Sequence, residues 1–159
     1  MRVGQGYDIH RLADGRPLVL GTLRLQADRG CEGHSDGDPV AHAVCDAILG
    51  ALALGDMGIW FPSSDERWKD APSSLFLIEI KKLVAERGAR LLNVDVTVVL
   101  AEPRLGGHLS AMGEALAGHL GCDHSRVSVK AKSGDGLGAT GRGEAVEAMA
   151  VALVETGED

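Results

Sequence analysis

Three residues early in the chain have the side-chain types and the spacing of a metal site. Asp8 and His10 lie two positions apart in a segment expected to be a strand, so their side chains point to the same face. His42, near the start of an expected helix, can supply a third ligand. Two imidazoles and one carboxylate, with a fourth position open, are the ligand pattern of a catalytic zinc. A surface Asp-x-His pair is the alternative, and residue types alone do not separate the two.

Polar residues crowd the start of the helix that carries His42, namely His34, Ser35, Asp36 and Asp38. On the helix itself, Asp46 lies one turn after His42. It is a candidate to orient the imidazole of His42 by a hydrogen bond to the ring nitrogen that faces away from the metal. A solvated carboxylate on the helix surface is the alternative for Asp46.

The glycine-rich segment 130–143 is a second candidate site. Its spacing Gly136-x-Gly138-x-x-Gly141 spells a dinucleotide fingerprint. That fingerprint needs a helix, a second parallel strand and an acidic residue about 20 positions later, for which the remaining residues do not suffice. The segment instead indicates a phosphate-binding loop of backbone N–H groups, with charge from Lys132 and Arg142. Asp135 could hold a hard cation such as Mg²⁺ on those phosphates. An exposed flexible loop is the alternative.

A third candidate is the turn 102–107, which joins an expected strand to an expected helix. The N-terminus of a helix presents unpaired N–H groups and can receive an anion. An ordinary strand-to-helix turn without a ligand is the alternative here.

The composition bounds the class of protein. The 159 residues, 45% hydrophobic and 25% charged, suffice for a single domain, expected over 1–159. No 18-residue apolar span and no signal peptide is recognisable, so we expect a cytoplasmic protein that does not bind membranes. Three widely spaced cysteines argue against a disulfide framework. A net charge of −7 and 3% aromatic residues disfavour nucleic-acid binding.

The order of expected elements indicates one two-layer α+β domain. Strands are expected over 2–10, 92–101 and 126–132, and helices over 39–54, 73–87 and 107–120. Asp38 is the expected N-cap of the first helix, with Pro39 at its first position. Segments 18–20 and 23–25 flank Gly21-Thr22 as a hairpin with a type I′ or II′ turn. Segment 144–155 stays open, because its alanines favour a helix and its alternation favours a strand.

Motifs along essentially the whole chain identify a family by resemblance. They are Gly6-Tyr7-Asp8-Ile9-His10-Arg11-Leu12, His34-Ser35-Asp36-Gly37-Asp38, Ala41-His42-Ala43, Leu54-Gly55-Asp56-Met57-Gly58, Phe61-Pro62, Asn93-Val94-Asp95-Val96-Thr97 and Thr140-Gly141-Arg142-Gly143-Glu144. In sequence, order and spacing they closely resemble the 2-C-methyl-D-erythritol 2,4-cyclodiphosphate synthases of the non-mevalonate isoprenoid pathway.

The resemblance implies a homotrimer with active sites between neighbouring subunits, in which segment 144–155 is a strand. The expected fold is then a mixed four-stranded sheet with helices packed on one face, plus a small hairpin. The resemblance also implies an isoprenoid diphosphate as a candidate occupant of the trimer's central cavity.

The resemblance implies two cations and a set of substrate contacts. Zinc, or a similar divalent transition metal, would lie on Asp8, His10 and His42, and Mg²⁺ or Mn²⁺ on Asp135. His34 and Ser133 would stabilise the transition state. The implied substrate-binding residues are Asp8, His10, His34, Ser35, Asp56, Gly58, Phe61, Ser63, Asp65, Leu100, Pro103, Arg104, Leu105, Lys132, Ser133, Ala139 and Arg142. Segments 56–58 and 61–65 would hold the methylerythritol phosphate, and segments 100–106 and 132–135 the cytidine nucleotide, largely through backbone groups.

The implied reaction is that of a phosphorus–oxygen lyase. The 2-phosphate of 4-diphosphocytidyl-2-C-methyl-D-erythritol 2-phosphate attacks the β-phosphorus, CMP leaves, and an eight-membered cyclic diphosphate forms. Because the nucleophile is already an anion, the protein needs no strong general base and must mainly fold the substrate and neutralise charge. Two other functions compete, namely a zinc phosphoester hydrolase with a linear product and a non-catalytic member that binds isoprenoid diphosphates.

The chain departs from the family pattern at four places. It has Ser63-Ser64 where Asp-Thr is usual, Asp135 where Glu is usual, Lys132-Ser133 in place of a Thr pair, and Ala139 where an aromatic residue is common. Asp can still bind Mg²⁺ and Ser keeps a hydroxyl, so we expect activity.

Overall fold

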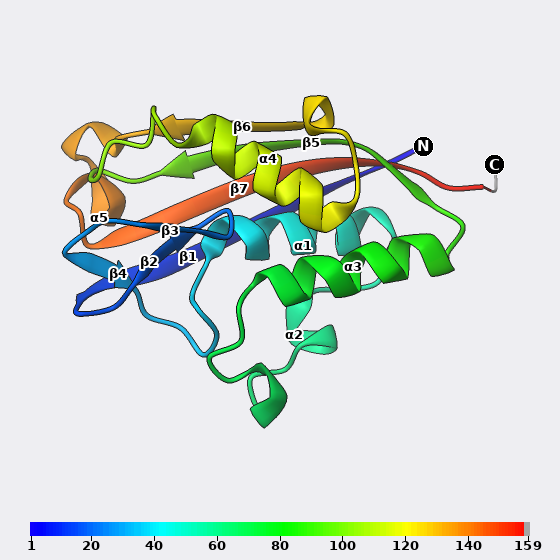
Figure 1. Ribbon diagram of the computed structural model, residues 1–159, viewed down its shortest axis with the longest axis horizontal. Coiled ribbons are helices and arrows are strands. Elements are labelled where there is room, and N and C mark those ends of the chain that lie inside the picture. The colour runs from blue at the N-terminus through cyan, green and yellow to red at the C-terminus, as the bar shows by residue number, and fades with distance from the viewer. Residues whose placement is uncertain (158–159) are drawn as a thin grey trace.

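A mixed sheet of five strands, in the order β4-β1-β7-β5-β6, forms one layer of the fold. The computed structural model describes residues 1–157 (Figure 1). The strands are β1 (Arg2–Asp14), β4 (Arg29–Cys31), β5 (Arg90–Val99), β6 (Val127–Lys132) and β7 (Ala145–Glu155). β7 pairs antiparallel with β1 and β5, whereas β5 and β6 are parallel. The predicted mixed α+β architecture is confirmed, and segment 144–155 is a strand rather than a helix.

Three helices of 12 or 13 residues form the second layer, and all pack on the same face of the sheet (Figure 1). They are α1 (Pro39–Ala51), α3 (Ser74–Glu86) and α4 (Leu109–Leu120). Shorter helical segments lie in the connections, namely α2 (Met57–Trp60), α5 (Gly138–Gly141), η1 (Glu66–Trp68), η2 (His124–Arg126) and η3 (Gly134–Gly136). Among residues 1–157, no helix has the length and apolar character that crossing a membrane would require.

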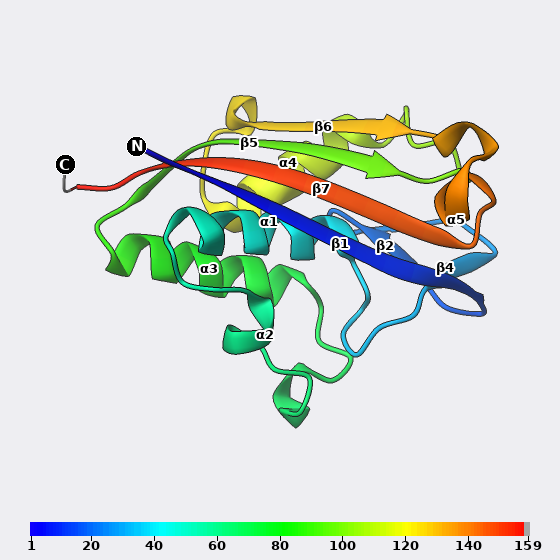
Figure 2. The ribbon, with the colours of Figure 1, turned by 180° about the vertical axis from the view of Figure 1, so that it is seen from behind.

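Alternation along the central strand separates the two faces of the sheet. In β7, the side chains that face the helices are at most 1% exposed, namely Val146, Ala148, Ala150, Ala152 and Val154. Large apolar side chains on the other face are 38–68% exposed, namely Val3, Tyr7, Ile9, Met149 and Val151. Figure 2 shows this face, where β1 and β7 lie in front of the helices. The sheet therefore has one covered face and one apolar face open to solvent.

The strand count corrects the prediction of four strands. β1 continues past the expected end near His10 to Asp14, and its last three residues pair with β4. β4 has only three residues, which is too short for a periodic pattern, and it is held by a partner distant in sequence. A short strand of this kind is specified by tertiary pairing and not by local propensity.

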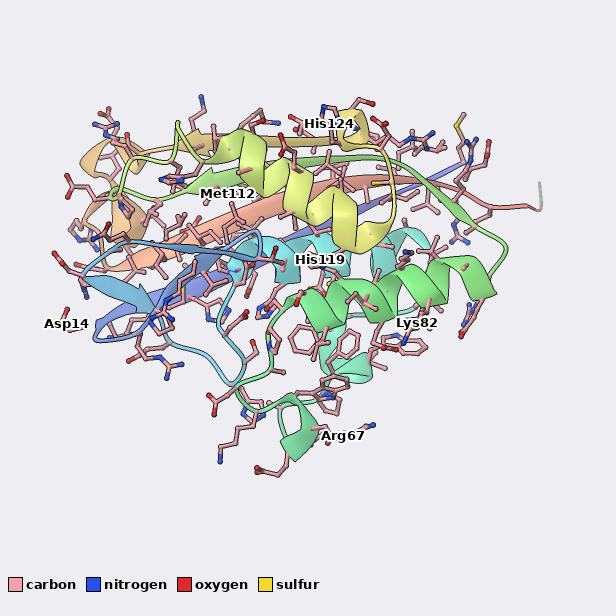
Figure 3. All side chains as sticks on the ribbon, viewed as in Figure 1. Asp14, Arg67, Lys82, Met112, His119 and His124 are labelled. Carbon is pink, nitrogen blue, oxygen red and sulfur yellow. The ribbon has the colours of Figure 1, made fainter. Side chains whose placement is uncertain are left out.

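The predicted hairpin is confirmed as β2 (Leu18–Leu20) and β3 (Leu23–Leu25). Gly21 and Thr22 both have positive φ, at 58° and 66°, which identifies the turn as type I′. A side chain at Gly21 would meet the Cβ of Met112 at 3.0 Å, so the turn lies against α4 (Figure 3). The hairpin is thus packed on the helix layer.

Asp38 joins this hairpin to the start of α1. As predicted, it is the N-cap, and its Oδ1 accepts from the N–H groups of Val40 and Ala41 at 3.0 and 3.1 Å. The same carboxylate accepts from Gly21 N at 3.0 Å and Thr22 N at 2.6 Å. Asp38 is fully buried, so four backbone donors depend on one side chain.

Replacing Asp38 with asparagine is expected to lower the free energy of unfolding by about 1–3 kcal/mol. The amide nitrogen of the new side chain would face a backbone N–H, so at least one buried donor would lose its acceptor. Urea denaturation followed by circular dichroism measures the effect, with the exposed Asp28→Asn as control. Equal unfolding midpoints for the two variants would contradict this role of Asp38.

β1 and α1 touch backbone to backbone. A Cβ added at Gly4 would lie 2.0 Å from the carbonyl oxygen of Ala47, and one at Gly6 would lie 2.0 Å from that of Ala43. No side chain separates the strand from the helix at these points. This close contact sets the distance between the residues that β1 and α1 carry farther along.

Candidate metal centre and active site

Asp8 and His10 on β1 and His42 on α1 converge, as the sequence predicted. Their ligand atoms all lie within 4.8 Å of one another. Asp8 Oδ2 lies 2.8 Å from His10 Nε2 and 3.0 Å from His42 Nδ1. The two histidine nitrogens are 3.4 Å apart. All three side chains are partly buried.

This spacing fits a tetrahedral metal. Ligand atoms about 2.0 Å from a zinc ion and at tetrahedral angles lie roughly 3.3 Å from one another. The separation of 3.4 Å between His10 Nε2 and His42 Nδ1 matches that value. The carboxylate of Asp8 is slightly closer to both, as expected where protons occupy the gaps between the groups. The donor set of two nitrogens and one oxygen therefore suits a divalent transition metal.

The charges in the cluster favour a cation. Burial would raise the pKa of Asp8, but hydrogen bonds from His10 and His42 hold it well below its usual range. Burial would lower the pKa of His10, but its hydrogen bond to Asp8 and the charge of that carboxylate outweigh burial and raise it. Asp8 is thus an anion, and the protons of its two hydrogen bonds lie between it and the rings of His10 and His42. A divalent cation would replace those protons.

The outer nitrogen of His10 faces a backbone acceptor. His10 Nδ1 lies 2.5 Å from the carbonyl oxygen of Glu32, and a carbonyl can only accept. The proton of Nδ1 therefore points to Glu32, so Nε2, which faces Asp8, is the ring nitrogen that a metal would take in exchange for a proton. The chain segment before α1 thereby selects the tautomer of His10.

The outer nitrogen of His42 faces two serine hydroxyls, with Nε2 3.2 Å from Ser35 Oγ and 3.1 Å from Ser73 Oγ. The prediction that Asp46 orients this ring is wrong. Asp46 Oδ1 instead accepts from Met57 N at 2.8 Å and so fixes the segment that follows α1. The reason is the direction of the ring, since both nitrogens of His42 are already engaged elsewhere.

The segment that contains His34 lies beside the loop before α3. His34 O accepts from Asp70 N at 2.8 Å, and Asp36 N donates to Ala71 O at 3.1 Å. The side chain of His34 is exposed, whereas Ser35 is buried against His42. Of the two predicted substrate contacts, Ser35 is therefore next to the metal ligands and His34 is at the adjacent surface.

An aromatic cluster connects segment 56–68 to the metal ligands. The ring of Phe61 lies 5.2 Å from Trp68 and 4.9 Å from Phe76, and Phe76 lies 5.8 Å from the ring of His42. Figure 3 shows Arg67 at the end of this segment, projecting from the rest of the chain. Few aromatic residues are present, but several gather at one site.

The other predicted residues of this segment have separate local roles. Asp56 is the N-cap of α2 and accepts from Ile59 N at 3.1 Å, while Gly58 lies within that helix. Asp65 is paired with Arg67, and Ser63 is exposed. Their backbone and side chains thus present polar groups beside the aromatic cluster.

A second group of predicted residues lines a cavity of about 950 Å³. Its lining includes Pro103, Arg104, Ser133, Asp135 and Arg142. The guanidinium of Arg142 is held by the carboxylate of Glu144, at 2.9 and 3.1 Å, and Asp135 is exposed. The two glycine- and proline-containing turns that the sequence singled out therefore meet in space.

Four predicted residues are not among those that line this cavity. Leu100 and Leu105 are each 3% exposed, so their side chains are not available to a ligand. The carbonyl of Lys132 accepts from Leu100 N at 2.9 Å, and that of Ala139 accepts from Glu144 N at 2.8 Å.

The predicted residues thus form two separate groups within one chain. The lining of the cavity contains none of Asp8, His10 and His42 among residues 1–157. The sequence did not indicate that Ser73 and the Glu32 carbonyl contact the metal ligands. From the sequence, Ser73 is only the expected beginning of a helix, and a backbone carbonyl leaves no signal in a sequence.

The comparisons with known proteins agree on one family. The YgbB family profile matches residues 1–155. A 2-C-methyl-D-erythritol 2,4-cyclodiphosphate synthase from Desulfosudis oleivorans is 50% identical over 154 residues, which cover 97% of this chain and 92% of the relative.

Two solved structures have the same fold. A 2-C-methyl-D-erythritol 2,4-cyclodiphosphate synthase in a form bound to CDP superimposes with a TM-score of 0.89 at 40% identity, over 97% of this chain and all of the other. The bifunctional IspDF from Campylobacter jejuni superimposes with a TM-score of 0.93 at 35% identity. That match covers 98% of this chain but only 42% of the bifunctional protein.

Proposed function

The chain belongs to the YgbB family, and we propose that it performs the cyclisation of 2-C-methyl-D-erythritol 2,4-cyclodiphosphate synthases at a divalent metal held by Asp8, His10 and His42. It converts 4-diphosphocytidyl-2-C-methyl-D-erythritol 2-phosphate to 2-C-methyl-D-erythritol 2,4-cyclodiphosphate with release of CMP. In class it is a phosphorus–oxygen lyase of the cytoplasm. The observation that carries the proposal is the convergence of three metal-ligand atoms in a chain that matches this family over residues 1–155.

Zinc is the proposed ion at this centre, because two imidazoles and a carboxylate at tetrahedral spacing suit it. When bound, it supplies a Lewis acid that withdraws charge from a phosphate oxygen and holds that phosphate in place. The chain itself supplies the anion of Asp8 and two imidazoles whose outer nitrogens are engaged. Ser35, next to His42, is a further proposed substrate contact.

The cavity lined by Pro103 and Ser133 is the proposed binding site of the cytidine nucleotide. One solved relative carries CDP, and the cavity of about 950 Å³ is large enough for a nucleotide. Arg104 and Arg142 line it and provide positive charge for phosphates, and Ser133 provides a hydroxyl. Asp135 is the proposed ligand of Mg²⁺ or Mn²⁺.

A homotrimer would join the two groups of residues into one site. The open apolar face of the sheet, with Tyr7, Ile9 and Met149 among its exposed side chains, supports burial against another copy of the chain. We propose that the metal ligands of one subunit lie beside the nucleotide cavity of its neighbour. An isoprenoid diphosphate is a proposed occupant of the cavity enclosed along the trimer axis.

The chain's residues are then proposed to position the substrate and to neutralise the charge of its phosphates. None of them needs to remove a proton. The attacking 2-phosphate is already ionised, and segments 56–58 and 61–65 are proposed to hold its end of the substrate. His34 and Ser133 are proposed to donate hydrogen bonds to oxygens whose charge grows as the bond to CMP breaks. Lys132 and Arg142 balance the charge of the diphosphate. The CMP leaves as an anion, so no acid is required.

Product analysis tests the function directly. Purified protein supplied with Zn²⁺ and Mg²⁺ is expected to release one CMP per substrate and to form a cyclic diphosphate, measured by chromatography and mass spectrometry. A linear product heavier by one water would identify a phosphoester hydrolase instead. If no CMP appears with metal-replete protein while isoprenoid diphosphates bind, the non-catalytic alternative is correct.

A further inference from the structure

Ser73 occupies the N-cap position of α3, yet its hydroxyl does not cap that helix. A serine at this position ordinarily accepts from a backbone N–H of the first turn. Here the side chain is fully buried and points to other partners. Its presence at the start of the helix therefore needs another explanation.

The hydroxyl of Ser73 lies between Asp36 and His42. Ser73 Oγ is 2.5 Å from Asp36 Oδ1 and 3.1 Å from His42 Nε2. Asp36 also accepts from Ser73 N at 2.8 Å through its other oxygen, so both carboxylate oxygens face the same residue. The loop that carries Asp36 and the start of α3 are thereby joined at the back of the His42 ring.

The direction of these hydrogen bonds follows from the donors available. An ionised carboxylate only accepts, so the single hydroxyl proton of Ser73 points to Asp36. The lone pair of Ser73 Oγ must then accept from His42, which places the ring proton on Nε2. His42 Nδ1 is then the nitrogen that faces Asp8 and His10, and the proton it shares with the Asp8 carboxylate is the one that a metal would replace.

Ser35 alone would not determine this tautomer. Its hydroxyl lies 3.2 Å from His42 Nε2 and accepts from Gly37 N at 3.3 Å. Since no acceptor other than the ring takes its proton in the described residues, this hydroxyl can rotate to donate to or accept from the ring. Only the pair of Ser73 and Asp36 requires a proton on Nε2.

The geometry points to Asp36 and Ser73 as a positioning relay that fixes the tautomer and orientation of His42 for metal binding. The inference rests on the proposed metal site and adds to it the part that prepares one ligand. A carboxylate that acts on a metal-bound histidine through a hydrogen bond orients the ring and increases its basicity. Here a serine hydroxyl stands between the two, and His10 has a backbone carbonyl in the same role.

Metal affinity is the quantity that tests the relay. Ser73→Ala is expected to weaken Zn²⁺ binding by about 10- to 100-fold, measured on metal-free protein by competition with a chromophoric chelator. Ser74→Ala, one position along the same helix, is the matched control and should bind Zn²⁺ as the wild type does. A Ser73→Ala protein that is less stable to heat but binds Zn²⁺ with unchanged affinity would overturn the proposal.

The tautomer provides a second measurement that needs no variant. In ¹⁵N spectra of histidine-labelled, zinc-loaded wild type, His42 is expected to carry its proton on Nε2. A proton on Nδ1 would overturn the relay even if Ser73→Ala did not fold. Wild-type protein that binds no Zn²⁺ would instead overturn the metal site itself, so the two failures are distinguishable.

Discussion

The substitution His42→Ala is expected to reduce the zinc content to background and to lower the rate of CMP release by about 10³-fold or more. His42 supplies one of the three ligand atoms that converge at the centre among residues 1–157, and its loss leaves two. A bound metal contributes several kcal/mol of charge stabilisation, and each 1.36 kcal/mol corresponds to about tenfold in rate. The remaining activity would come from binding and alignment of the substrate alone.

The measurement combines metal analysis of the purified protein with a CMP-release assay at saturating substrate. The control is His124→Ala, since this histidine lies in η2 between α4 and β6 and is exposed (Figure 3). It should keep wild-type zinc content and rate. Normal turnover by a zinc-free His42→Ala protein would show that the centre is not used for catalysis.

Gly6→Ala is expected to disrupt both the fold and the metal centre. The added Cβ would lie 2.0 Å from the carbonyl oxygen of Ala43 and 2.7 Å from the backbone nitrogen of Ala47. Backbone atoms of a buried helix cannot yield as a flexible side chain would, so α1 must shift away from β1. We expect the free energy of unfolding to fall by about 3 kcal/mol. Zinc affinity should fall as well, because His42 moves with the helix.

Gly118→Ala, made in the same protein, is expected to have the opposite effect on stability. Gly118 lies inside α4, and a Cβ there would meet nothing within 4 Å. Alanine is the better helix former, so this variant should gain about 0.5–1 kcal/mol and keep its zinc affinity. Urea denaturation and chelator competition on both variants make the comparison. Unchanged stability and affinity for Gly6→Ala would mean that the strand and helix are not held at this distance.

The metal ligands could be predicted because each depends on local pattern. Asp8 and His10 share a face through strand alternation, and Asp38 with Pro39 marks the start of the helix that carries His42. The hairpin is likewise predictable from Gly21-Thr22 with its flanking apolar residues, but the choice between a type I′ and a type II′ turn needs the φ angles of the structure. Segment 144–155 was decided only by the family resemblance, because alanine-rich alternation satisfies both helix and strand.

What could not be predicted depends on contacts between distant segments. β4 exists because three residues pair with the end of β1, and their own sequence carries no period. Helical spacing predicts Asp46 at His42, but the outer nitrogen of the ring faces Ser73, the residue before α3. A sequence shows which residues share one face of a helix or strand. It does not show which other helix or strand packs against that face.

The division of the candidate residues into two groups has a genetic consequence. Under the proposed assembly, a chain that has lost His42 still offers an intact cavity at Pro103 and Ser133 to its neighbour. A chain damaged at Asp135 still offers intact metal ligands. Two inactive alleles of these two kinds, expressed together, would form mixed assemblies in which some sites combine the two undamaged halves. Loss-of-function alleles at the two groups would therefore complement each other, whereas two alleles at the same group would not.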